Sequence, residues 1–213
     1  MSCAFDFAHY RELLEAARAG GYRFASFEAT PRAGDLLLRH DVDLSLEAAL
    51  AMAELEAELE APATYFLMTR SEFYNLDAPS GADAIERLRR LGHRVGLHAV
   101  YPEVAHDSRF DRVLAWHNPD PEYMTAPVED FVNAMQPGVF DEEHYRSDSN
   151  QRWRYGCPHE ALARGDFEWL QLLTHPEIWA YSGETMRETM LAMLQAEREL
   201  RVEQLEADRI DLS

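Results

Sequence analysis

The chain has 213 residues, and its 39 acidic residues against 20 basic ones give a formal net charge of −19. Nucleic acids and anionic membrane surfaces attract basic segments, so this charge balance argues against both as partners. All 20 basic residues are arginine, and a chain without lysine can form neither a P-loop nor a lysine Schiff base. Hydrophobic residues make up 46% of the chain, which is enough for one domain over residues 1–213.

The N-terminal residues and the two cysteines bear on the compartment. The first residues lack the basic stretch followed by an apolar stretch that marks a signal peptide. No apolar run approaches the roughly 18 residues of a membrane span. Cys3 and Cys157 are far apart and form no CxxC pair, so we expect no thiolate zinc site, no redox motif and no secreted disulfide framework. We therefore expect a cytoplasmic protein.

Helical and strand patterns alternate along the chain. The first helix is predicted over Phe7–Ala19, before the Gly20-Gly21 pair that ends it. Further helices are expected over residues 44–59, in "SGADAIERLRRLGH", over residues 130–134, and from about residue 183 to about Asp208, where Ser182 is the expected cap. The expected strands are "YRFASFE", "DLLLRHDVD", "ATYFLM", "RVGLHAV", "RVLAWHNP" and "WLQLLTHP". This alternation favours an α/β fold with parallel strands.

Four of these strands end in side chains that titrate or bind metals. They are His40 with Asp41 and Asp43, then His98, then His117 with Asn118, and finally His175. Because the carboxyl ends of parallel strands share one face of a barrel or sheet, we expect these side chains to converge. Three Asp and His ligands with one open position are typical of catalytic zinc. A nearby carboxylate and imidazole would serve as base and acid.

Each of these residues also has a plain structural alternative. Asp43 precedes a helix and suits an N-cap. His40 and Asp41 suit a hydrogen-bonded pair, His98 a buried core histidine, and His175 a loop position. The recurrence at four strand ends favours the functional interpretation over these alternatives.

The segment "YRSDSNQRW", residues 145–153, is the second polar cluster and overlaps the end of residues 119–152, where weak periodicity predicts loops. Polar clusters of this kind are usually solvated turns. The functional alternative is that Arg146, Asp148 and Trp153 bind substrate, or that Asp148 orients a catalytic histidine or aspartate.

Together these segments resemble a known family. "RHDVD", "ATYFLM", "GHRVGLH" and "LLTHP" resemble, in order, motifs of the polysaccharide deacetylase (NodB-homology) superfamily. "YN" at residues 74–75, "WHNP" and "YRSDS" resemble a branch associated with surface-polysaccharide biosynthesis. The resemblance covers about residues 10–179. It implies an incomplete, distorted (β/α) barrel that hydrolyses an N-acetyl group on a sugar or oligosaccharide with a divalent metal, zinc above others.

The resemblance also implies roles for individual residues. Asp41 matches the general base, Asp43 and His98 match metal ligands, and His175 matches the acid. Two departures stand out: Val42 separates the paired aspartates, and Pro102 occupies the place of a second metal histidine. The third ligand is therefore open between His117 and His40. The expected substrate-binding residues are His40, Asn118, Arg146, Asp148 and Trp153.

The connection after about residue 100 is short for a crossover between parallel strands, which usually carries a helix. We expect the barrel to lack a helix there, leaving a side that is open or covered by a second chain in an oligomer. Two alternatives to a deacetylase remain. One is a non-catalytic barrel that binds a saccharide or a protein partner, and the other is a metallohydrolase that acts on a different amide bond.

Overall fold

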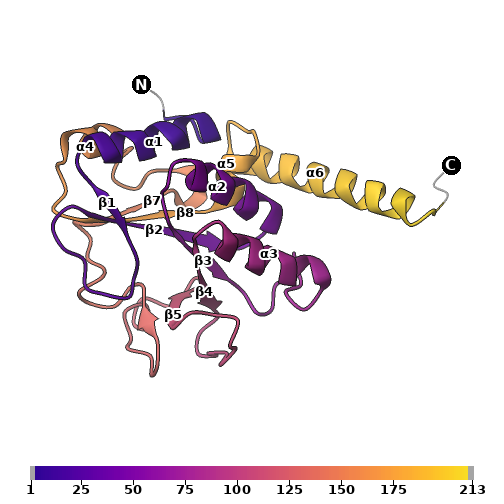
Figure 1. Ribbon diagram of the computed structural model, residues 1–213, viewed down its shortest axis with the longest axis horizontal. Helices are drawn as coiled ribbons and strands as arrows, with labels where there is room; N and C mark the ends of the chain where they lie inside the picture. The colour runs from indigo at the N-terminus through magenta and orange to yellow at the C-terminus, as the bar shows by residue number, and fades with distance from the viewer. Residues whose placement is uncertain (1–2, 211–213) are drawn as a thin grey trace.

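The computed structural model describes residues 3–210. Its regular elements alternate between helix and strand, as Figure 1 shows. In chain order they are α1 Phe7–Ala19, β1 Arg23–Ala25, β2 Asp35–Val42, α2 Leu46–Glu58, β3 Thr64–Leu67, α3 Pro79–Arg90, β4 Arg94–Ala99, β5 Val113–Trp116, β6 Val132–Asn133, β7 Tyr145–Ser147, the 3-10 turn η1 Ser149–Gln151, α4 His159–Arg164, β8 Leu170–Thr174, α5 Pro176–Ala180 and α6 Met186–Ala207.

One parallel sheet organises the chain. Its strand order is β6-β5-β4-β3-β2-β8-β7, and β1 pairs on the first half of β2. The pairings between these strands are all parallel. Within the described residues 3–210, β6 and β7 are the outer strands and do not pair with each other. The sheet is therefore an incomplete (β/α) barrel, as the sequence predicts.

Strand β2 pairs with β1, β3 and β8, and all eight of its residues are buried. Alternate side chains enter different cores, as the period of two along a strand requires. Leu36 and Leu38 join the larger core under the helices, whereas Leu37 joins a smaller core with Phe66 and Val139. Both faces of the sheet are thus covered, one by helices and the other by the irregular chain after β5.

Helices connect the strands from β2 to β4, with α2 between β2 and β3 and α3 between β3 and β4. α1 packs on α4, and α2 packs on α3 and α5. Between β4 and β5, residues 100–112 contain no helix. The short connection predicted from the sequence is confirmed, and it leaves the β5 side of the sheet without a helical cover in Figure 1.

Two local predictions are wrong. Residues 130–134 form no helix, because Val132 and Asn133 pair with β5 as strand β6 instead, a long-range contact that local propensity does not encode. The last helix is capped by Thr185 rather than Ser182, since Thr185 and Glu188 form a reciprocal capping box that Ser182 cannot form.

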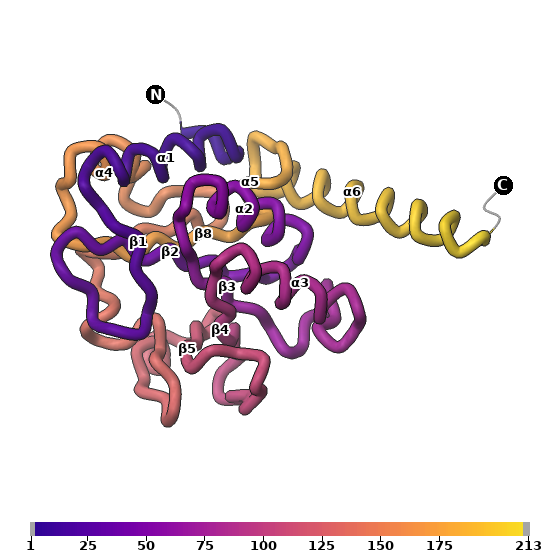
Figure 2. Tube along the Cα trace, viewed as in Figure 1, coloured from indigo at the N-terminus to yellow at the C-terminus, as the bar shows by residue number. Residues whose placement is uncertain are grey.

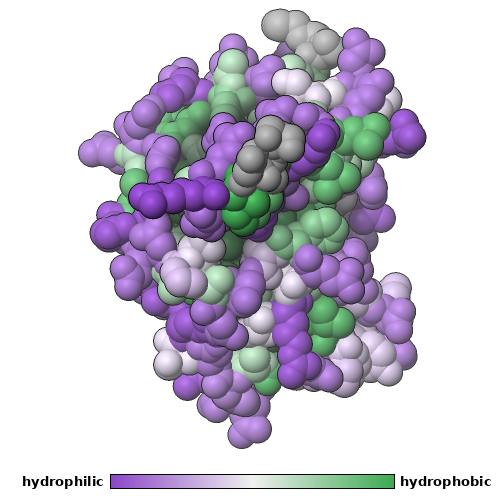
Figure 3. All heavy atoms as spheres, turned by 90° about the vertical axis from the view of Figure 1, so that its right-hand side faces the viewer, coloured by the Kyte–Doolittle hydropathy of each residue, from purple (hydrophilic) through white to green (hydrophobic). Residues whose placement is uncertain are grey.

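The long helix α6 projects away from the sheet in Figures 1 and 2. Apolar residues of α6 lie exposed on it, including Leu191, Leu194 and Leu200. Figure 3, viewed from the side on which this helix ends, shows apolar side chains scattered over a mostly hydrophilic surface. No helix within residues 3–210 has the length and apolar character to cross a bilayer.

The two cysteines lie together although the sequence analysis leaves them unpaired. Cys3 precedes α1, Cys157 precedes α4, and the structure joins them as a disulfide with their Cα atoms 6.3 Å apart. The contact follows from the packing of α1 on α4. Since 154 residues separate the two cysteines, no local pattern could reveal it.

Candidate active site

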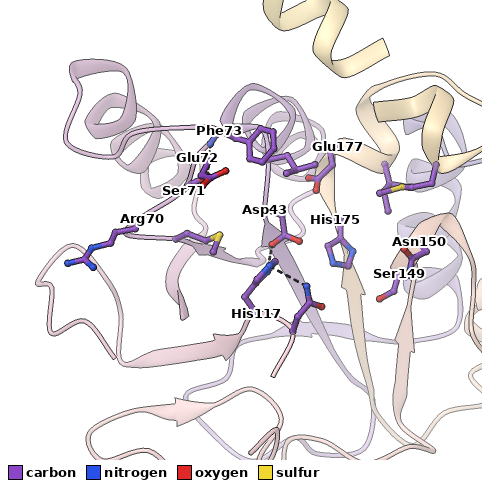
Figure 4. A pocket seen from close by; sticks show the side chains of 15 residues that line it. Asp43, Arg70, Ser71, Glu72, Phe73, His117, Ser149, Asn150, His175 and Glu177 are labelled. Atoms are coloured by element: carbon purple, nitrogen blue, oxygen red, sulfur yellow. Dashed lines mark hydrogen bonds and ion pairs between the residues drawn. The ribbon is translucent and has the colours of Figure 1, made fainter. Parts of the chain in front are cut away.

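The candidate site lies where four neighbouring strands end. Asp43 follows β2, His98 belongs to β4, His117 follows β5, and His175 follows β8. The sheet order places these strands side by side or one strand apart. Figure 4 shows Asp43, His117 and His175 projecting toward one another at the mouth of a cavity.

Three of these side chains form a compact set of donor atoms. Asp43 Oδ1 lies 3.0 Å from His98 Nε2 and 3.1 Å from His117 Nδ1, and the two histidine nitrogens are 3.2 Å apart. Zinc bonds of about 2.0–2.1 Å in a tetrahedral arrangement hold ligand atoms about 3.3 Å apart. The three donors therefore fit a divalent ion with an open fourth position. Of the two alternatives for a third ligand, His117 lies with Asp43 and His98, and His40 does not.

Contacts behind the donor atoms fix their orientation. His98 Nδ1 lies 3.0 Å from the carbonyl oxygen of Ala115 and donates to it, which fixes the ring with Nε2 facing Asp43. Burial raises the pKa of Asp43, but hydrogen bonds from His117 and His98 outweigh it and hold that pKa well below its usual range. The hydrogen bond to Asp43 raises the pKa of His117. Asp43 is therefore ionised, as a metal ligand must be.

Asp41 lies beside this set and is paired with an arginine. Arg39 Nε and Nη2 donate to the two carboxylate oxygens of Asp41 at 2.8 and 2.7 Å, and both side chains are buried. Burial raises the pKa of Asp41, yet the charge of Arg39 brings it below its ordinary value. Asp41 Oδ2 is 3.8 Å from His98 Nε2. Asp41 and Asp43 thus reach the same side of the sheet, as strand alternation predicts.

His175 stands on another wall of the cavity and is held by Asp148. His175 Nδ1 donates to Asp148 Oδ1 at 2.6 Å, while the His175 backbone and Trp179 Nε1 donate to Asp148 Oδ2. Burial lowers the pKa of His175, but the Asp148 carboxylate raises it to about 10. His175 is therefore protonated at neutral pH. Asp148 thus contacts His175, as the second of its two predicted roles requires, and it does not line the cavity.

The cavity in front of these residues has a volume of about 360 Å³. Asn118, Ser149 and Glu177 add polar groups to its lining. Glu177 is 2% exposed, and within residues 3–210 its Oε2 atom has no hydrogen-bond partner. Burial raises the pKa of Glu177 to about 8, against a smaller opposing effect of His175. A neutral carboxylic acid thus lines the cavity.

His40 takes no part in this cavity. Its side chain leaves the opposite face of β2, where it is fully buried between Glu56 of α2 and Thr174 of β8, at 2.8 and 2.7 Å. Glu56 also accepts hydrogen bonds from Tyr10 and Tyr65, each at 2.6 Å. A substrate cannot reach His40 without opening this core, so the predicted substrate contact of His40 is withdrawn.

The other predicted substrate-binding residues divide in two groups. Asn118 lines the cavity next to His117. Arg146 instead lies over the rings of Tyr155 and Phe167, and Trp153 packs against Phe5 and Trp179. Neither Arg146 nor Trp153 lines the cavity, because packing with neighbouring aromatic rings occupies their side chains.

Sequence reasoning missed two polar residues of the site, Arg39 and Glu177. Arg39 is two residues before Asp41 on one strand, and alternation alone would have put both on one face. Glu177 lies two residues after His175 at the start of α5, and only the fold reveals its burial. Pro102, at the place of the family's second histidine, is exposed in the loop after β4.

Comparisons with known proteins add little to this geometry. No family model and no curated protein matches the chain. Among solved structures, the chain is similar to a peptidoglycan deacetylase of Bdellovibrio bacteriovorus, with 14% identity and a TM-score of 0.38. The match covers 86% of this chain and 54% of that one, so the chain spans about half the length of that structure. The roles of the site residues are therefore drawn from the residues themselves.

Proposed function

We propose that the protein is a metal-dependent amide hydrolase that removes an acyl group from a sugar. The acyl group that we expect is N-acetyl. The carrying observation is the triangle of donor atoms from Asp43, His98 and His117, with edges of 3.0–3.2 Å. The resemblance of "RHDVD", "GLH" and "THP" to polysaccharide deacetylase motifs supports an N-acetyl sugar as substrate.

Asp43, His98 and His117 are the residues that would hold the divalent ion. When bound, zinc would supply Lewis acidity to the acyl carbonyl and to a water molecule. Asp41 accepts a proton from the attacking water, because it borders the donor set and its carboxylate is kept ionised and fixed by Arg39.

His175 supplies the proton that the leaving amine takes up when the amide bond breaks. Asp148 engages Nδ1 of the imidazole, which leaves Nε2 to donate to the nitrogen of the leaving amine. The products are a carboxylate and a free amino sugar. Asn118, Ser149 and Glu177 offer hydrogen bonds to the sugar hydroxyls within a cavity of about 360 Å³.

The test combines metal content with hydrolysis. Protein purified without chelator is analysed by elemental mass spectrometry, and acetate release is measured from N-acetylated amino sugars. We expect about one active-site metal ion per chain and turnover, both lost in Asp43→Ala. Asp83→Ala, which removes an exposed carboxylate of α3, is the matched control and keeps both.

The rival is a barrel that binds saccharide without turning it over. Its supporting observation is Pro102, which removes one histidine of the family's metal set. Saccharide binding without acetate release, in protein that takes up no metal at Asp43, would establish the rival. Release of a different acyl group from a panel of amides would support the proposed amide hydrolysis but replace the N-acetyl sugar as its substrate.

A further inference from the structure

A second group of metal-competent side chains lies away from the candidate active site. Cys3 precedes α1, His9 lies in the first turn of α1, Cys157 precedes α4, and His159 begins α4. The ligand atoms of Cys3, His9 and Cys157 lie within 4.8 Å of one another. A second set within the same limit joins His9 and His159 with Glu12. Figure 1 shows α1 and α4 side by side.

His9 is the centre of this group. Its Nε2 atom lies 2.9 Å from Cys3 Sγ and 3.3 Å from Cys157 Sγ, and its side chain is 13% exposed. Its Nδ1 atom lies 3.0 Å from Glu12 Oε2. A neutral imidazole that donates from Nδ1 to a carboxylate presents a lone pair at Nε2, which is the arrangement usual for histidines that bind metals.

Within residues 3–210, the disulfide gives that lone pair no hydrogen to accept. Neither sulfur of a disulfide carries a hydrogen, so Cys3 and Cys157 cannot donate to His9 Nε2 in the oxidised form. Reduction replaces the S–S bond by two thiols that point at the same nitrogen. Two thiolates and an imidazole are the ligand types of structural zinc sites.

We propose that the reduced chain binds a zinc ion through Cys3, Cys157 and His9, with His159 as the fourth ligand. The His9 and His159 rings have centroids 5.3 Å apart, so His159 needs only a side-chain rotation to face the same point. The site belongs to the Cys₂His₂ class, whose tetrahedral shell is closed to substrate. Its role is therefore structural: it joins the segment before α1 to the segment before α4.

Disulfide and metal site exclude each other. Two thiol molecules reduce the disulfide, giving two protein thiols and one disulfide of the reductant. Zinc then displaces a proton from each of Cys3 and Cys157 as it binds their thiolates. The bound metal protects both sulfurs from reoxidation, so the redox state of the compartment decides which crosslink holds α1 to α4.

Cobalt distinguishes this site from the candidate active site. A cobalt ion bound to thiolates absorbs in the near ultraviolet by charge transfer from sulfur, whereas Asp43, His98 and His117 offer no sulfur. The chain is reduced with a phosphine under argon and titrated with Co²⁺. We expect the thiolate absorption in the reduced chain and in Asp43→Ala, and its replacement on addition of Zn²⁺. The oxidised chain is expected to lack it.

Variants of the four residues sharpen the assignment. Cys3→Ser and Cys157→Ser are expected to abolish the thiolate absorption while metal still binds at Asp43. Glu12→Gln is expected to weaken Co²⁺ binding 10–100-fold, which is about the usual effect of removing the carboxylate behind a ligand histidine. His159→Gln is expected to change the cobalt spectrum in the visible region, which reports coordination geometry.

One result overturns the proposal. The Asp43→Ala variant is first shown to be fully reduced by thiol count and folded by circular dichroism. If this variant then shows no thiolate absorption in excess Co²⁺, the site at Cys3, Cys157 and His9 does not exist. That result leaves the proposed hydrolase untouched. Conversely, thiolate absorption in a chain that hydrolyses no acyl sugar retains this site and removes the proposed function.

Discussion

His40 and Asp41 are neighbours in β2, yet their side chains leave opposite faces of the sheet into different surroundings. Asp41 lies beside His98, with 3.8 Å between its Oδ2 and His98 Nε2, next to the cavity that Asp43 lines. His40 enters a sealed network in which Glu56 is satisfied by three donors. The two neighbours thus differ in their partners: Asp41 lies beside the donor atoms of Asp43 and His98, whereas His40 is hydrogen-bonded within the core.

The largest effect is expected on the sealed side. Glu56→Ala leaves the hydroxyls of Tyr10 and Tyr65 and one nitrogen of His40 without their acceptor in the core. Removing one member of a buried charged network costs about 3–5 kcal/mol of unfolding free energy. Urea unfolding measures it. Glu58→Ala on the same helix removes only an exposed pair with Arg11 and is expected to cost at most about 1 kcal/mol.

A result in which Glu56→Ala and Glu58→Ala are equally stable would contradict the distinction between the two faces. It would mean that the donors of Tyr10, Tyr65 and His40 find other partners when Glu56 is absent.

The cavity side is expected to respond in activity rather than stability. His98→Gln removes a proposed metal ligand, and we expect acyl hydrolysis to fall at least a thousandfold, which is about 4 kcal/mol in the barrier. The unfolding free energy is expected to fall by about 1–2 kcal/mol, because glutamine can still donate to the Ala115 carbonyl. His106→Gln, outside the cavity, is the control. Equal activity of the two variants would exclude His98 from the site.

Much of this contrast could be predicted from the sequence. The apolar run of β2 predicts a buried strand, and the period of two predicts that Asp41 and Asp43 share one face. That same rule puts His40 on the other face. The resemblance to the deacetylase motifs says nothing of these faces, so it leaves His40 as a ligand candidate although alternation excludes it.

The rest depends on contacts between distant elements. That His117 rather than His40 lies with Asp43 and His98 follows from β5 lying beside β4, a sheet order that residue patterns do not specify. Glu56 lies four residues after Met52 on the buried stripe of α2, so its burial could be predicted. Its partners could not, since they come from α1, β2 and β3. Strand β6 was predicted as a helix for the same reason.

The next predicted effect concerns Glu177, a buried carboxyl group on the cavity side that is expected to lower the unfolding free energy. Its pKa is raised to about 8 by burial, so the folded chain keeps a proton that the unfolded chain loses above its ordinary pKa near 4.5. Glu177 therefore contributes stability at low pH that is lost as pH rises from about 4.5 to about 8. As pH rises from 5 to 8, the unfolding free energy of Glu177→Gln is expected to increase by about 3 kcal/mol relative to that of the wild type.

Urea unfolding of both chains across this pH range, with chelator present, measures the difference. A difference that does not change with pH would show that Glu177 titrates normally and is solvated in the cavity.

The smallest predicted effect concerns Asp148, which links the cavity to the packed side of the molecule through Trp179. Burial lowers the pKa of His175 and the Asp148 carboxylate raises it to about 10, so the acid stays protonated well above neutral pH. In Asp148→Asn that support is lost. The alkaline limb of kcat/KM is expected to move to lower pH by at least one unit, about 1.4 kcal/mol.

The direction of this shift distinguishes the possible roles of Asp148. If His175 donates a proton, lowering its pKa removes the active form as pH rises, and activity near pH 6 is affected least. If Asp148 served only to pack Trp179, the variant would lose activity equally at every pH and the limb would not move. If His175 were instead a base, the same substitution would extend activity toward acid. A pH profile of the two chains therefore separates a positioning role for Asp148 from a purely structural one.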